Sequence, residues 1–319
     1  MGATTKKQHY IWRKYLSPWT ENNSNTGKIA CLRKQKVFST SLMNVAHENY
    51  FYGIAEMSPR EKNLVYSLAI EHGANRQKEV NQGWLEFYCA PYDIANWIQN
   101  SGKSINGQHY DIHKDKNFTA LLIEHIERLH CQIEISGIKY IELIKNRDLS
   151  FWNDDKSRDE FSFFMSMQIF RTKCMRDKIV GCIDRSLETC RGLEDIRPNN
   201  IWLPLSLIFA SNIGAHITHD YFPVLLCNSE DYFVVGDQPI INTFAIPYSE
   251  REPNDMELFY PITPHTAILI THDKQFVSGQ IKEIDNSMMK KYNLMEMRNS
   301  EEITFAKSED QLKSLALKL

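Results

Sequence analysis

Residues 159–172 read Asp-Glu-Phe-Ser-Phe-Phe-Met-Ser-Met-Gln-Ile-Phe-Arg-Thr, and this stretch decides the fold. Apolar side chains recur at helical spacing as far as residue 189, and in the first half they occupy more than one side of the helix. They are Phe161, Phe164, Met165, Met167, Ile169, Phe170, Met175, Ile179 and Ile183. A helix that is apolar on several sides has to be surrounded by other elements, so we predict a central helix over 159–189.

Helical periodicity predicts further helices at residues 58–73, 79–99, 118–144 and 201–217. The first begins at a capping box with proline at the first helical position, Ser58-Pro59-Arg60-Glu61, and Gly73 ends it. In the second, Pro91 is the place where the helix would break. The polar residues 100–116 form a loop, and the most apolar run, 201–217, is expected to be a buried helix.

After Pro223 the pattern changes to short β-branched and aromatic runs between turn residues, which predict strands at 224–227, 232–235, 258–260, 267–271 and 303–306. A helix is predicted over 285–297, and a second capping box, Ser308-Glu309-Asp310-Gln311, starts a terminal helix. The sequence therefore predicts an α+β fold, in which a mainly helical body packs on a small, mostly antiparallel C-terminal sheet.

No repeat or Pro/Gly-rich linker divides the chain, so we expect a single domain over 1–319. Its parts are an N-terminal segment (1–57), a helical region (58–220), a strand-rich region (221–307) and a terminal helix (308–319).

Composition bounds the class of protein. With 42% apolar and 24% charged residues among 319, a disordered, collagen-like or coiled-coil protein is excluded. With a net charge of -3 the protein has no overall excess of positive charge for binding nucleic acid, but this does not exclude a local basic patch. The seven cysteines lack CxxC spacing, which is typical of reduced thiols in the cytosol. The N-terminus is polar, and no run reaches about 18 consecutive apolar residues. The sequence therefore predicts a cytoplasmic protein with no membrane partner.

Two histidine pairs have spacings that bring imidazoles together on a helix. His109 and His113 could hold a metal, but they lie in the polar loop, and we favour a solvated loop there. His216 and His219 end an apolar helix, where imidazoles interact favourably with the helix dipole, so capping is the preferred interpretation. His125 and His130 are expected at the surface.

The run Lys6–Leu16 interleaves basic and aromatic residues, a combination that clamps phosphates and stacks on bases. The alternative, which we favour on this run alone, is an amphipathic helix whose aromatic rings dock into the core. Arg171 inside the predicted central helix needs an anion or a carboxylate, and Gln168 shares its face. Asp237 follows a predicted strand, where it is either a catalytic acid or a turn residue that accepts backbone N–H bonds.

Four ordered motifs together resemble the DUF4238 family, a domain of unknown function. They are Gln8-His9-Tyr10 with Arg13 and Tyr15-Leu16; Gln168 to Thr172; Asp237-Gln238-Pro239; and Phe259 to Pro264. The resemblance spans residues 6 to about 307. Trp12 stands where many relatives carry proline, and Gly236-Asp237-Gln238-Pro239 stands where they prefer Ser-Asp-Asn-Pro, which puts a role for the neighbouring hydroxyl and amide in doubt. The resemblance implies an antiviral or toxin-like context.

The leading hypothesis is an enzyme that cleaves phosphodiesters in nucleic acid or a nucleotide. In it, Arg13 and Arg171 bind a phosphate, Gln168 binds the substrate and His9 is the general acid or base. Asp237 orients His9 or holds a divalent metal, and the sequence identifies no cofactor beyond this alternative. In the competing hypothesis these residues form a buried polar network and the protein acts through a protein partner; in a third, the arginines bind a nucleotide without turning it over.

Overall fold

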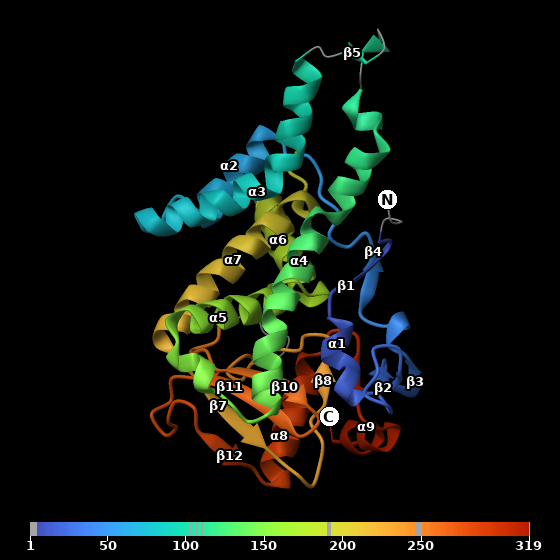
Figure 1. Cartoon of the computed structure of the whole chain (residues 1–319), viewed down its shortest axis with the longest axis vertical. Coiled ribbons are helices and arrows are strands. Elements are labelled where there is room, and N and C mark those ends of the chain that lie inside the picture. The colour runs from blue at the N-terminus through green and yellow to red at the C-terminus, as the bar shows by residue number, and fades with distance from the viewer. Residues whose placement is uncertain are drawn as a thin grey trace. The chain divides into compact units, whose positions relative to one another are not determined.

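The computed structural model describes residues 5–101, 104–105, 108–109, 111–189, 193–246 and 251–318, with the side chains of 104–105 and 108–109 left out (Figure 1). The chain forms two compact units, each built from three stretches. The first unit comprises Met1–Gln8, Glu48–Ile133 and Met175–Asn212, and the second comprises His9–His47, Glu134–Cys174 and Ile213–Leu319. The α+β class is confirmed: helices dominate, and most strand residues lie in sheets of the second unit.

Five elements run from one unit into the other. They are β1 (Lys7–His9), β4 (His47–Asn49), α4 (Lys116–Lys145), α6 (Lys173–Thr189) and α7 (Pro198–Asp220). By length and composition α7 could cross a membrane, but 67% of its most apolar window is buried inside the fold, as in the core helix of many proteins.

In the first unit, α2 (Pro59–Ala69) and α3 (Asn75–Asn100) precede the short hairpin β5 (Ser104–Ile105) and β6 (Gln108–His109). The capping box at the start of α2 is confirmed, because the Ser58 side chain accepts from the Glu61 N–H and the Glu61 carboxylate accepts from the Ser58 N–H. Glu61 is fully buried and also accepts from Arg197 and Asn200, so one carboxylate joins the start of α2 to the start of α7.

The predicted break of the second helix at Pro91 is wrong, since α3 runs through Pro91 to Asn100. Proline has no N–H for the carbonyl four residues earlier, which here belongs to Phe87. The Nε2–H of His125 donates to that carbonyl at 2.9 Å, and the two rings stack at 4.3 Å. The prediction that His125 and His130 lie at the surface is also wrong: His125 is partly buried and His130 is 2% exposed.

We expect His125→Phe to lower the free energy of unfolding by about 1–2 kcal/mol, because the ring stays but the buried Phe87 carbonyl loses its donor. In a Pro91→Ala background the introduced alanine restores the helical N–H, so the same change should cost little. Urea unfolding of the wild type, the two single variants and the double variant measures this coupling. Equal losses in both backgrounds would show that His125 does not serve the Phe87 carbonyl.

The predicted central helix is two helices, α5 (Asp155–Phe170) and α6, interrupted at Arg171 and Thr172. Apolar periodicity continues across the break, but the Thr172 hydroxyl donates to the Gln238 side-chain oxygen at 2.5 Å and anchors a non-helical corner. The buried position is confirmed, since Phe161, Phe164 and Met165 are at most 1% exposed. Gly137 lets α4 approach α5: a Cβ there would lie 2.3 Å from the Phe164 ring.

The larger sheet of the second unit has the order β12-β7-β11-β10-β9. Its strands are β7 (Phe222–Cys227), β9 (Ile241–Asn242), β10 (Leu258–Thr263), β11 (Thr266–Thr271) and β12 (Ile281–Glu283). All neighbours are antiparallel except β12 and β7. Helix α8 (Asn286–Asn299) lies beside this sheet (Figure 1). Its Met289 joins a buried core with Phe233, Phe259 and Leu269.

The smaller sheet has the order β3-β2-β13-β8 and unites both ends of the chain. Its strands are β2 (Lys28–Arg33), β3 (Lys36–Ser41), β8 (Val235–Gly236) and β13 (Thr304–Ala306), and α9 (Glu309–Ala316) covers it as the predicted terminal helix. Strands β2 and β3 were not predicted, because the polar turn at Lys34 and Gln35 lacks glycine although both residues have positive φ. The strand predicted over 232–235 is only β8 at 235–236.

Candidate functional site

All five predicted site residues belong to the second unit. Gln168, Arg171 and Asp237 are 4%, 3% and 3% exposed, whereas His9 and Arg13 are partly exposed. A catalytic group must meet its substrate, so burial favours a structural role for the first three. Their catalytic and binding roles stay predictions.

Arg171 closes a buried ion pair. Its guanidinium donates from Nη1 to the Glu134 carboxylate and from Nη2 to the His9 backbone oxygen at 2.9 Å. The Arg171 side chain is 2% exposed and that of Glu134 is 16% exposed. The arginine therefore ties the last residue of β1 to α4, as the competing network hypothesis requires.

Asp237 holds the loop that precedes β13. Its carboxylate accepts from the backbone N–H groups of Glu301 and Glu302, both at 2.7 Å, and of Ile303 at 3.2 Å. Burial raises the pKa of Asp237 to about 6, although the three backbone hydrogen bonds act to lower it. The carboxyl group is therefore mostly ionised at neutral pH. This is the turn-type role weighed for Asp237, and His9 is not among the partners described for it.

His9 lies in a cationic environment. Burial, followed by the charges of Arg13 and His47, lowers its pKa from 6.5 to about 4. The ring is therefore neutral at pH 7 and can accept a proton but has none to spare as a general acid. The Arg13 guanidinium contacts the Met43 sulfur, and no carboxylate pairs with it in the part of the chain that the structure describes.

The N-terminal run is strand β1 followed by the four-residue helix α1 (Arg13–Leu16), so the predicted amphipathic helix is wrong in form. Its aromatic rings nevertheless dock into the core, with Tyr10, Trp12 and Tyr15 at most 9% exposed. The Tyr15 hydroxyl donates to the Pro261 oxygen at 2.6 Å, and its ring stacks on Tyr260 at 5.0 Å. The first and fourth motifs thus meet directly.

A groove of about 450 Å³ lies elsewhere in the second unit. It is lined by Ser17, Pro18, Asn23, Lys145, Tyr232, Thr263, Pro264, His265 and Lys307. Its volume suits a small molecule or one nucleotide. The lining combines two lysines, a histidine, a tyrosine and short polar side chains, and contains no carboxylate.

The turn between β10 and β11 forms one wall of the groove and is anchored on both sides. The Pro264 oxygen accepts from the Phe233 N–H at 2.7 Å, and the His265 oxygen accepts from the Asn228 N–H at 3.1 Å. The His265 ring donates from Nδ1 to the Asn228 oxygen at 2.9 Å and contacts the Tyr232 ring at 4.9 Å. These bonds hold the exposed His265 ring at a fixed position, and the exposed Tyr232 ring lies against it beside the groove.

The two lysines that line the groove have different hydrogen-bond partners. Lys307, just after β13, donates to the oxygens of Thr20 (2.7 Å), Pro18 (3.1 Å) and Asn23 (3.3 Å), all uncharged acceptors, so its positive charge is not neutralised by them. Burial lowers the pKa of Lys307. Lys145, the last residue of α4, pairs with Glu142 at 2.9 Å and keeps further N–H groups for a ligand.

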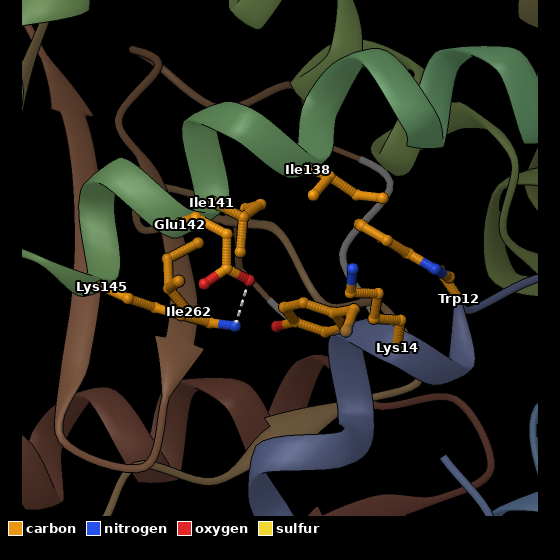
Figure 2. Close-up of a pocket in the computed structure, with 8 residues that line it drawn as sticks. Trp12, Lys14, Ile138, Ile141, Glu142, Lys145 and Ile262 are labelled. Atoms are coloured by element: carbon orange, nitrogen blue, oxygen red, sulfur yellow. Dashed lines mark hydrogen bonds and ion pairs between the residues drawn. The ribbon is translucent and has the colours of Figure 1, made fainter. Parts of the chain in front are cut away.

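Lys145 also lines a smaller cavity, drawn in Figure 2 with its partner Glu142 on α4 and with Trp12 and Lys14 from the N-terminal segment. The cavity has a volume of about 10 Å³, which is room for a single water molecule. A ligand therefore does not fit there, and the larger groove is the candidate site.

A family model described as "Protein of unknown function (DUF4238)" matches residues 7–310. The chain belongs to the DUF4238 family. No curated protein and no solved structure matches it. In this DUF4238 chain the motif residues Arg171, Thr172, Asp237 and Tyr260 all form contacts within the second unit.

The structure describes the second of the two histidine pairs fully and the first only in part. The His109 side chain lies outside the described residues, and His113 sits in a short 3₁₀ turn over Ile112–Lys114. His216 pairs with Asp220 at 2.7 Å in the last turn of α7. Over the described ranges no three His, Cys, Asp or Glu side chains are arranged to hold a metal ion.

The groove residues were not predicted from the sequence. Lys145 and Lys307 look like ordinary surface lysines, and His265 follows the quoted motif Phe259 to Pro264 by one residue. The available signal was Pro264, which marks a turn directly before a histidine. What brings Lys145 and Lys307 to that turn is the fold alone.

Proposed function

We propose that this DUF4238 protein binds the phosphate groups of a nucleotide, free or within single-stranded nucleic acid, in the groove beside His265. The observation that carries the proposal is the groove's lining: two lysines and a histidine without a carboxylate, next to an exposed tyrosine ring. Lysine ammonium groups are common phosphate ligands, and aromatic rings stack on nucleobases. Tyr232 is 37% exposed and its ring is held beside His265.

The size of the groove supports a small or single-stranded ligand. A groove of about 450 Å³ admits one nucleotide, and a net charge of -3 offers no extended basic surface for long duplex DNA. The phosphodiester chemistry expected from the sequence is compatible with this ligand class. Catalysis by His9 and Asp237 stays a separate prediction, which the same binding assay, followed by product analysis, can test.

Lys145→Gln is expected to weaken nucleotide binding about tenfold or more, because it removes a charged N–H donor from the groove. The measurement is fluorescence anisotropy with a fluorescent ATP analogue at low ionic strength, repeated at higher salt, where screening should weaken wild-type binding.

Lys139→Gln is the matched control, since Lys139 lies on the same helix and also pairs with a carboxylate, Glu160 at 2.7 Å, but does not line the groove. Binding by Lys139→Gln should equal that of the wild type. Equal weakening by the two substitutions would move the ligand away from the groove.

A further inference from the structure

The fixed orientation of His265 gives the groove a candidate general base. A backbone carbonyl can only accept, so the bond to the Asn228 oxygen requires that Nδ1 of His265 carry the proton. In the neutral ring Nε2 is then the lone-pair acceptor. No hydrogen bond to Nε2 is found among the described residues, and the side chain is exposed beside the groove.

The cations lie in the same groove as this base. Lys145 and Lys307 line it with His265, and no carboxylate is among the lining residues. Lys145, which pairs with Glu142, has further N–H groups for a phosphate. The three N–H groups of Lys307 already donate to the oxygens of Pro18, Thr20 and Asn23, so Lys307 acts through its positive charge. A base beside fixed positive charge suits attack by a hydroxyl on a phosphodiester, because the base removes the hydroxyl proton and the cations stabilise the charge that grows on the phosphorus oxygens.

We infer that His265 is the general base of a ribonuclease-type reaction in this groove, with single-stranded RNA as the substrate. The inference rests on the proposed function, which supplies phosphate binding. RNA is the substrate class because its own 2′-hydroxyl lies next to the scissile phosphate and serves as nucleophile. Tyr232 would stack on a flanking base and hold the strand.

In the reaction, the 2′-oxygen forms a bond to phosphorus while its proton passes to Nε2 of His265, and the bond from phosphorus to the 5′-oxygen breaks. The departing 5′-oxygen takes a proton from water, and His265 returns its proton to the solvent. The products are a 2′,3′-cyclic phosphate and a free 5′-hydroxyl, with no oxidant, reductant or co-reactant consumed.

The test is cleavage of a fluorescent single-stranded RNA by wild type, His265→Gln and the control His272→Gln, whose histidine lies on the same unit but outside the groove. Wild type and His272→Gln should yield the cyclic phosphate by mass spectrometry. His265→Gln should cleave at least about 100-fold more slowly.

Binding is measured in parallel with the uncleavable all-deoxy strand, which separates the two proposals. Wild-type protein that binds this strand but leaves RNA intact would overturn the inference and leave the proposed function standing. Undiminished cleavage by His265→Gln would also overturn it. If wild type does not bind the strand or a nucleotide, the proposed function itself fails.

Discussion

Replacement of Arg171 by methionine is expected to lower the free energy of unfolding by about 3–5 kcal/mol. The substitution keeps an unbranched apolar chain of similar length but leaves the Glu134 carboxylate without its guanidinium partner and the His9 oxygen without its donor. Because the arginine side chain is 2% exposed, water cannot take its place without rearrangement. Thermal denaturation followed by circular dichroism measures the loss.

The double variant Arg171→Met/Glu134→Met is the control. Removing both charges leaves no stranded ion, so most of the lost stability should return, as it often does when a buried pair is replaced by apolar residues. If Arg171→Met unfolds at the wild-type temperature but fails to bind nucleotide, the buried pair is not structural, and the sequence-based role of Arg171 in binding phosphate would gain support.

Asp237→Ala is expected to lower the free energy of unfolding by about 2–4 kcal/mol at pH 7, since three backbone N–H groups lose their acceptor. The three belong to Glu301, Glu302 and Ile303. The buried Ile303 N–H contributes most, because water can partly replace the acceptor at the exposed residues Glu301 and Glu302. Urea unfolding monitored by tryptophan fluorescence provides the value. Hydrogen exchange of these three amides should rise first, because the damage is local.

The matched control for Asp237 is Asp231→Ala. Asp231 lies a few residues before Asp237 in the chain and is partly exposed. Its carboxylate accepts one hydrogen bond, from the Tyr232 N–H at 2.8 Å, so removing it should lower the free energy of unfolding by less than about 1 kcal/mol. A fully stable Asp237→Ala protein that has lost RNA cleavage would contradict the structural assignment and revive the catalytic one.

Periodicity and capping predicted the helices well. The box at Ser58 and Glu61 forms as expected, and α8 and α9 occupy the predicted segments. These signals are local, since a cap or an apolar stripe lies within a few residues of the helix it describes. The α+β class followed from the change of pattern after Pro223.

The errors arise where distant contacts override local preference. Helix α3 continues through Pro91 because His125, distant in the sequence, donates to the Phe87 carbonyl, which has no N–H partner at Pro91. Apolar periodicity runs through Arg171 and Thr172, but a bond from Thr172 to Gln238 fixes a corner there. The strands β2 and β3 were hidden because they pair with each other through a turn without glycine, and β2 pairs with β13 from the opposite end of the chain.

The candidate site shows the same limit. Some residues of the four motifs meet in space, since Tyr15 stacks on Tyr260 and Arg171 donates to the His9 oxygen. Residue type could not separate a buried network from an active centre, because both employ arginine, aspartate and glutamine. The low exposure of Gln168, Arg171 and Asp237 favours the network, and the burial of a particular side chain depends on the whole fold.

Photo-crosslinking with 8-azido-ATP, followed by peptide mass spectrometry, tests most directly whether the ligand lies in the groove and not among the motif residues. The account predicts label on peptides that contain Tyr232 or His265, reduced by Lys145→Gln and unchanged by Lys139→Gln. Label concentrated on the peptide that carries His9 and Arg13, with none near the turn after β10, would contradict it.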